Sequence, residues 1–152
     1  MNVIRNILDI KSIVVGLEVK DKAELLETMV ELAAESGKIQ NPETATERIF
    51  AREKLMSTGV GNGVALPHAK TNEIYETVAS FAILRKAIDY DSLDDEPVNV
   101  VLLVLGKEDN IGEHLKMLSN ISKLLNKDSF ISELLSAETS DEVLEIFDKY
   151  DE

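Results

Sequence analysis

The chain has 152 residues, 44% of them hydrophobic and 30% charged, which predicts a single globular domain over residues 1–152 with a hydrophobic core. Its net charge of −13 argues against nucleic-acid binding, because a phosphate backbone would repel an acidic chain. The same charge fits equally well a solvated surface or attraction to basic partner proteins. The absence of cysteine excludes disulfides, thiolate metal sites and cysteine nucleophiles. The sequence has no long apolar run and no signal-like N-terminus, which predicts a cytoplasmic chain without membrane insertion.

The first part of the chain predicts one strand followed by two helices. Residues 13–19 are strand-like, and a capping box that begins at Asp21 opens a helix with an apolar stripe. Gly37 ends that helix. Asn41-Pro42 supplies a cap and a first-turn proline for a second helix, which runs to about Leu55.

The remaining elements are predicted from apolar patterns and cap signals. Residues 64–66 form a short strand candidate that stops at Pro67-His68, and residues 77–84 and 98–105 are rich in β-branched and apolar side chains. An acidic turn region, residues 89–96, separates the latter two. Three helices are predicted to follow. The first starts at Ile111 or Gly112 and has a buried stripe of Leu115, Leu118, Ile121 or Ser122, and Leu125. The second starts from a cap at Asp128, and the third from a capping box at Thr139 and Glu142. Strands alternating with helices predict an α/β domain with a mixed sheet flanked by helices.

The chain has two histidines, and His68 follows a glycine-rich loop directly after the short strand candidate. Glycines at alternate positions allow close backbone approach to an anion, and hydroxyls add donors. The predicted phosphate loop comprises Ser57, Thr58, Gly59, Gly61 and Gly63. Arg52 is expected to hold phosphoryl oxygens in a forked pair of hydrogen bonds. A neutral imidazole is a good nucleophile, so this combination suits a histidine that accepts a phosphoryl group.

Each of these features also has a simpler interpretation. A histidine after proline is usually a turn residue, glycines often make tight turns, and Arg52 could be a solvated helix charge. His114 lies in the first turn of a predicted helix, where the helix dipole disfavours a positive charge and so favours a neutral ring. Such a ring could hydrogen-bond His68 or a phosphate.

Other chemistries fit the sequence less well. Two histidines without cysteine leave only carboxylates to complete a zinc site, so we predict no metal and no cofactor. The chain has no Gly-x-Ser-x-Gly nucleophile elbow, and its glycine loop lacks the Gly-Lys-Ser/Thr ending of a nucleotide-binding P-loop.

The segment from Glu53 to Ala69 resembles the active-site signature of the fructose/mannitol-type IIA domain of the bacterial phosphoenolpyruvate-dependent sugar phosphotransferase system. Every constrained position of that signature is matched: Glu53, Val60, Gly61, Val64, Ala65, Leu66, Pro67, His68 and Ala69. The likeness extends to residues 112–118, which resemble the family's second-histidine helix. The chain departs from the family at Ala87, where glycine is frequent, and at Gly106, where alanine is frequent; we expect neither departure to touch the chemistry.

The resemblance implies that His68 is phosphorylated on Nε2 by the phosphocarrier HPr, itself charged through enzyme I, and passes the group to a IIB domain during sugar uptake. It implies that the chain is a phosphotransferase component, with His114 orienting or stabilising the phosphohistidine and Arg52 steadying its oxygens. Val60 and Leu66 are candidates for an apolar partner patch around an open acceptor site, although burial in the core fits each of them equally well. Two alternatives stay open: a nitrogen-regulatory member of the family that binds target proteins according to its phosphorylation state, and a degenerate domain that only binds partners.

Overall fold

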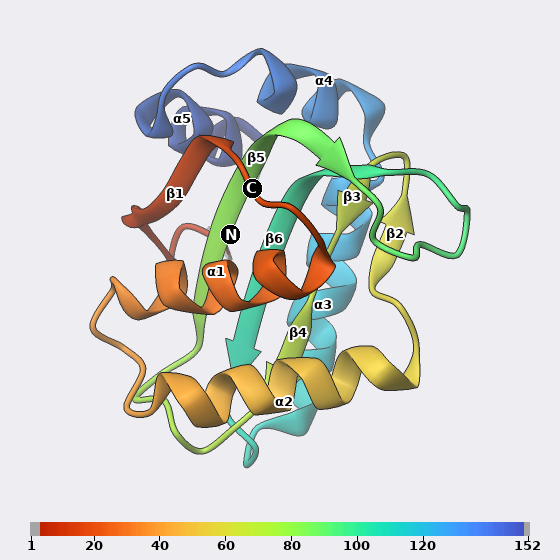
Figure 1. The fold of residues 1–152 in the computed structure, drawn as a ribbon. Coiled ribbons are helices and arrows are strands. Elements are labelled where there is room, and N and C mark those ends of the chain that lie inside the picture. The colour runs from red at the N-terminus through yellow and green to blue at the C-terminus, as the bar shows by residue number, and fades with distance from the viewer. Residues whose placement is uncertain (1–3, 151–152) are drawn as a thin grey trace.

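A computed structural model describes residues 4–150, which form a six-stranded mixed sheet with helices on both faces (Figure 1). The predicted fold class is therefore confirmed. The elements in chain order are β1 (Leu8–Leu17), α1 (Lys22–Ala34), α2 (Pro42–Leu55), β2 (Gly59–Gly61), β3 (Val64–Ala65), β4 (His68–Lys70), β5 (Val78–Ile88), β6 (Val98–Gly106), α3 (Ile111–Leu125), α4 (Asp128–Ser136) and α5 (Ser140–Tyr150).

Strand β6 lies at the centre of the sheet. The strand order is β1-β5-β6-β3-β2, and β4 also pairs with β6. The β5–β6 pair is antiparallel, whereas β1 is parallel to β5, and both β3 and β4 are parallel to β6. The short strands β3 and β4 follow one another along the same side of β6, separated by Leu66 and Pro67. Proline has no N–H to donate to a sheet ladder, which accounts for the break between them.

The two central strands are apolar on both faces because helices cover both sides of the sheet. Alternate residues of β5 enter different cores: Ala79, Phe81 and Ile83 pack toward one, and Val78, Ala82 and Leu84 toward the other. The first core includes side chains from α3, α4 and α5, and the second includes side chains from α1 and α2. Figure 1 shows the same layering, with α1 and α2 in front of the sheet and the later helices behind it.

Local cap signals predicted most helix starts correctly. The Asp21 carboxylate accepts a hydrogen bond from the Glu24 N–H at 2.9 Å, the Asn41 side chain accepts from two first-turn amides, and the Thr139 hydroxyl accepts from the Glu142 N–H at 3.1 Å. The cap at Asp128 is wrong: Lys127 occupies the cap position, and Asp128 is the first helical residue.

Two further expectations are corrected by the strand and helix packing. The short strand expected before Pro67-His68 is present as β3, but His68 itself begins a further strand, because the chain resumes pairing with β6 directly after Pro67. Leu115 is 61% exposed, so the buried stripe of α3 does not include it. His114 is buried in its place at 5% exposure.

Candidate functional site

His68 lies where β4 begins, at an edge of the sheet between α2 and α3. Its pairing partner on β6 is Val104, whose N–H donates to the Pro67 carbonyl at 3.0 Å. Helices α2 and α3 cover opposite faces of the sheet, and both extend past this edge. A cavity of about 730 Å³ therefore opens between them beside His68. Its lining includes Arg48, Arg52 and Leu55 from α2, His68 and Lys70 from β4, and Ile111, His114 and Leu115 from α3.

A single backbone contact determines the protonation pattern of His68. Its Nδ1 lies 2.9 Å from the Leu66 carbonyl oxygen, which can only accept. The proton of the neutral ring is therefore on Nδ1, and Nε2 keeps a free lone pair. Burial lowers the pKa of His68, and the Arg52 charge lowers it further, against the opposing effects of the Leu66 bond and Glu53. His68 is thus a neutral ring with one defined nucleophilic nitrogen.

The second histidine shares this cavity. The ring centroids of His68 and His114 are 6.1 Å apart, with a 50° angle between the rings. Burial, followed by the nearby His68 and Lys70, lowers the pKa of His114 to about 4. His114 is therefore neutral near pH 7, as its place in the first turn of α3 predicted.

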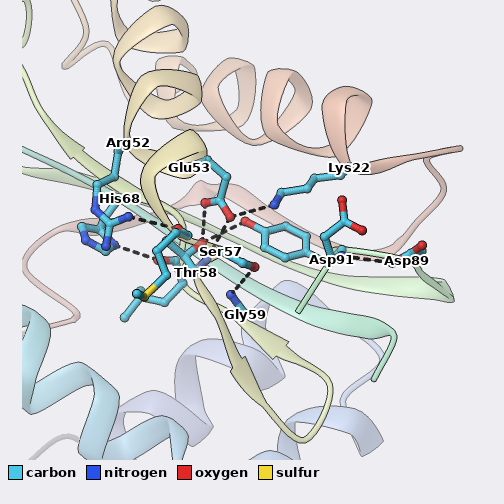
Figure 2. Close-up of polar contacts among 12 residues, drawn as sticks. Lys22, Arg52, Glu53, Ser57, Thr58, Gly59, His68, Asp89 and Asp91 are labelled. Carbon is cyan, nitrogen blue, oxygen red and sulfur yellow. Dashed lines mark hydrogen bonds and ion pairs between the residues drawn. The ribbon is translucent and has the colours of Figure 1, made fainter. Parts of the chain in front are cut away.

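Arg52 approaches the same cavity from the end of α2. Its Nη1 donates to the Met56 carbonyl at 3.1 Å, which orients the guanidinium, and Figure 2 shows the Arg52 side chain beside His68. Arg48, four residues earlier, lies on the same helix face and lines the same cavity, where it pairs with Glu108 at 2.8 Å. In a chain with a net charge of −13, cationic side chains thus gather at the cavity.

Thr58 of the predicted phosphate loop points into the protein instead of the cavity. Its hydroxyl donates to the Glu53 carboxylate at 2.6 Å, and its N–H donates to the other carboxylate oxygen at 2.8 Å (Figure 2). The Tyr90 hydroxyl then donates to the Thr58 oxygen, 2.9 Å away. Lys22 pairs with Glu53 at 2.9 Å, and its ammonium lies 4.3 Å from the centre of the Tyr90 ring.

This largely buried group, with Glu53, Thr58 and Tyr90 inside and Lys22 partly exposed, anchors the segment that supports His68. The Thr58 carbonyl accepts from the Leu66 N–H at 2.9 Å, and the Leu66 carbonyl accepts from His68. Burial and the Glu53 charge raise the pKa of Tyr90, so its hydroxyl stays a donor. The sequence reasoning missed this group, although Glu53 is a constrained position of the recognised motif.

The glycines of the predicted phosphate loop shape the β2–β3 turn and do not line the cavity. A Cβ at Gly59 would lie 2.3 Å from the Ser92 hydroxyl, so the loop packs closely there. Gly61 and Gly63 have φ values of +99° and +83°, which favour glycine. Between them, the Asn62 N–H donates to the Asp94 carboxylate at 3.2 Å, so a protein anion already occupies the loop. Of the predicted loop, Ser57 also stays local, since its hydroxyl accepts from the Gly59 N–H at 3.2 Å.

Exposed apolar side chains lie at the cavity. Leu55, Ile111 and Leu115 line it and are 81%, 51% and 61% exposed. Met56, which follows Leu55 at the end of α2, is 58% exposed, and we call these four residues the apolar rim. Leu66 is buried at 3%, so of its two interpretations the structure supports core packing and not a partner patch. Val60, the other candidate, is exposed on β2 but does not line the cavity.

Within residues 4–150, no cluster of three or more histidine or carboxylate side chains could hold a metal ion. The same residues contain no helix that is both long and apolar enough to span a membrane.

Comparisons with known proteins identify relatives of this chain. Residues 6–150 match the family model described as phosphoenolpyruvate-dependent sugar phosphotransferase system, EIIA 2. The chain is 32% identical over 148 residues to the fructose-specific EIIABC component of Bacillus subtilis, covering 97% of this chain but only 23% of that much longer protein.

Several solved structures share the fold. The nitrogen regulatory protein IIA-Ntr from Neisseria meningitidis is 32% identical with a TM-score of 0.87, and the match covers 93% of this chain and 97% of that one. The IIA mannitol enzyme of Escherichia coli, solved in complex with its phosphorylated IIB enzyme, has a TM-score of 0.78 at 21% identity, covering 91% of this chain and 95% of that one.

Proposed function

Because the chain belongs to the EIIA 2 family of the phosphoenolpyruvate-dependent sugar phosphotransferase system, we propose that it carries a phosphoryl group on Nε2 of His68. The observation that carries this proposal is the hydrogen bond from His68 Nδ1 to the Leu66 carbonyl. It leaves Nε2 as the one ring nitrogen with a lone pair to attack phosphorus.

The transfer step needs no separate base. The Nε2 lone pair attacks phosphorus, the P–N bond of the donor phosphohistidine breaks, and its electron pair returns to the donor's ring nitrogen. His68 keeps its Nδ1 proton throughout, so the phosphorylated ring gains imidazolium character. The Leu66 carbonyl, already hydrogen-bonded to that proton, stabilises this charge.

The cavity supplies the electrostatic part of the reaction. Phosphoryl transfer depends mainly on alignment and on stabilising negative charge. Arg52 and Lys70 line the cavity beside His68, so we assign them to the phosphoryl oxygens. His114 is neutral and can donate a hydrogen bond without adding charge.

We assign HPr as the phosphoryl donor and a IIB domain as the acceptor. The apolar rim of Leu55, Met56, Ile111 and Leu115 supports docking of both, since three of its four side chains line the cavity of His68 and all four would otherwise face water. The E. coli mannitol IIA structure, which shares this fold, was solved with its IIB enzyme. By analogy, one rim serves donor and acceptor in turn, with the chain acting in sugar uptake in the cytoplasm.

A regulatory role is the second candidate, favoured by the likeness to the nitrogen regulatory protein of N. meningitidis. In that role the phosphorylated and unphosphorylated forms of His68 would bind a target protein differently. The two candidates are separated by mixing the phosphorylated chain with IIB domains. Loss of the label to a IIB domain supports transport, whereas retention with every IIB domain supports regulation.

The deciding experiment is intact-protein mass spectrometry after incubation with enzyme I, HPr and phosphoenolpyruvate. We expect the wild type to gain one phosphoryl mass and His68→Ala to gain none. The label should be lost in acid and stable in base, because a P–N bond is acid-labile. Full labelling of His68→Ala, or an acid-stable label, would contradict the assignment and implicate a hydroxyl such as that of Ser57.

A further inference from the structure

Gly106, the last residue of β6, lies directly against the ring of His114. A Cβ added at Gly106 would lie 2.2 Å from His114 Nδ1, 2.8 Å from Cε1 and 3.1 Å from Cγ. Real Cβ contacts are not this short, so the ring of His114 fills the space that any other residue at position 106 would need. We infer that Gly106 is a positioning residue: it leaves room for the His114 ring in an orientation in which Nε2 carries the proton and faces the phosphoryl site.

The unpaired state of His114 Nδ1 selects the tautomer. This atom is buried and has no hydrogen-bond partner among the described residues. An Nδ1–H would be a buried donor without an acceptor, and such donors are rarer in proteins than acceptors left partly unsatisfied. The neutral ring therefore leaves Nδ1 bare against Gly106 and carries its proton on Nε2.

The Nε2–Cδ2 edge of the His114 ring is the edge that can contact a phosphoryl group. Because Nδ1, Cε1 and Cγ are the atoms nearest Gly106, the Nε2–Cδ2 edge faces away from β6. His114 lines the cavity that also contains His68. The two rings then have complementary tautomers: His68 presents a lone pair on Nε2, and His114 presents an N–H. This inference rests on the proposed function, because an N–H donor at this place acts on a phosphoryl group carried by His68.

The backbone at Gly106 is not free to yield to a larger residue. Gly106 pairs with Lys70 across the β4–β6 ladder, and its carbonyl accepts from the Thr71 N–H at 2.9 Å. In Gly106→Ala the histidine ring must therefore rotate, or the first turn of α3 must move outward. Either change moves Nε2 of His114 relative to His68. The departure at position 106 thus reaches the site, contrary to the expectation from sequence.

Gly112→Ala is a matched control. Gly112 is the second residue of α3, in the same turn as His114. A Cβ added there would meet nothing within 4 Å, and its φ is not positive. We expect nitrogen-15 NMR of the wild-type imidazoles near pH 7 to show His114 protonated on Nε2 and His68 protonated on Nδ1. In Gly106→Ala the His114 pattern should change and its pKa should rise as Nδ1 becomes more exposed. Gly112→Ala should resemble the wild type in both respects.

Transfer kinetics give a second readout. With phosphorylated HPr as donor, Gly106→Ala should transfer about tenfold more slowly, with a smaller change in the KM for the donor, because the substitution removes no side chain of the apolar rim. Urea unfolding in two backgrounds separates the ring contact from a general need for glycine. Gly106→Ala should lower the unfolding midpoint of the wild type but not that of His114→Ala, which has no ring to displace.

The inference is overturned if wild-type His114 carries its proton on Nδ1, a result that needs no variant to fold. It is also overturned if Gly106→Ala matches Gly112→Ala in tautomer, pKa and transfer rate, or if it destabilises both backgrounds equally. The NMR readouts need no phosphoryl donor. A wild type with the expected tautomers that gains no phosphoryl group would therefore refute the proposed function and leave the seating of His114 standing.

Discussion

Glu53→Gln tests whether the buried group beneath the site depends on a charged acceptor. The Glu53 carboxylate accepts from the Thr58 N–H, the Thr58 hydroxyl and the Lys22 ammonium. Glutamine has nearly the same shape but replaces one acceptor oxygen with an NH₂ donor. At least one donor among Thr58 and Tyr90 is then left without an acceptor, and both residues are buried.

The expected loss follows from these contacts. A buried donor without a partner costs about 1–3 kcal/mol, and a hydrogen bond to a charged group contributes about 1.5–3 kcal/mol. The lost ion pair adds little, because the Lys22 side chain is 21% exposed and can turn to water. We therefore expect Glu53→Gln to lower the free energy of unfolding by about 3 kcal/mol.

Urea denaturation followed by circular dichroism measures this loss. With a slope of about 2 kcal/mol per molar, the midpoint should fall by about 1.5 M. Glu47→Gln is the matched control, since Glu47 is exposed on the same helix, and its stability should stay within about 0.5 kcal/mol of the wild type. Equal stabilities of the two variants would refute the idea that Glu53 anchors this segment.

Three further predictions concern stability measured by urea unfolding. His114 has a pKa of about 4 in the folded protein, against 6.5 for the free side chain. Between these two pH values the unfolded chain therefore binds more protons than the folded one. Wild-type stability should fall by up to about 1.4 kcal/mol per pH unit as the pH drops from 6.5 to 4. His114→Gln should show a shallower decline, and parallel pH profiles would contradict this. Gly59→Ala should cost about 1–3 kcal/mol through its contact with Ser92, whereas unchanged stability would mean that the Ser92 segment yields freely. Phe147→Ala should cost about 4 kcal/mol, because the ring is fully buried and packs edge-on against two other phenylalanines; a loss below about 1 kcal/mol would place the core elsewhere.

Features that depend on near neighbours in the chain were predictable from sequence. The caps at Asp21, Asn41 and Thr139 each involve amides two or three residues away, so the residue types alone indicated these helix starts. The apolar runs of β5 and β6 were recognisable because strands buried on both faces need apolar side chains at every position. The motif around His68 likewise indicated the family before any geometry was known.

Predictions that depended on contacts between residues far apart in the sequence were less reliable. The glycine loop was expected to cradle a phosphate, yet the turn at Gly61 and Gly63 faces Asp94, more than 30 residues later in the chain. Leu115 fitted the apolar stripe of a helix, but it lies where α3 passes the edge of the sheet, so no second layer covers it.

The sequence by itself determined the five helices, the longer strands and which histidine is the candidate carrier, because caps, strand patterns and the motif are local. It did not indicate the short strands β2 and β4, which form by pairing with β3 and β6 in the sheet. Only the tertiary structure decided what surrounds that histidine. Parallel pairing of β4 with β6 sets His68 two residues from the level of Gly106, and packing of α3 behind the sheet brings His114 against that glycine. Residues 46 positions apart meet only because two helices cover opposite faces of one sheet and leave a cavity at its edge.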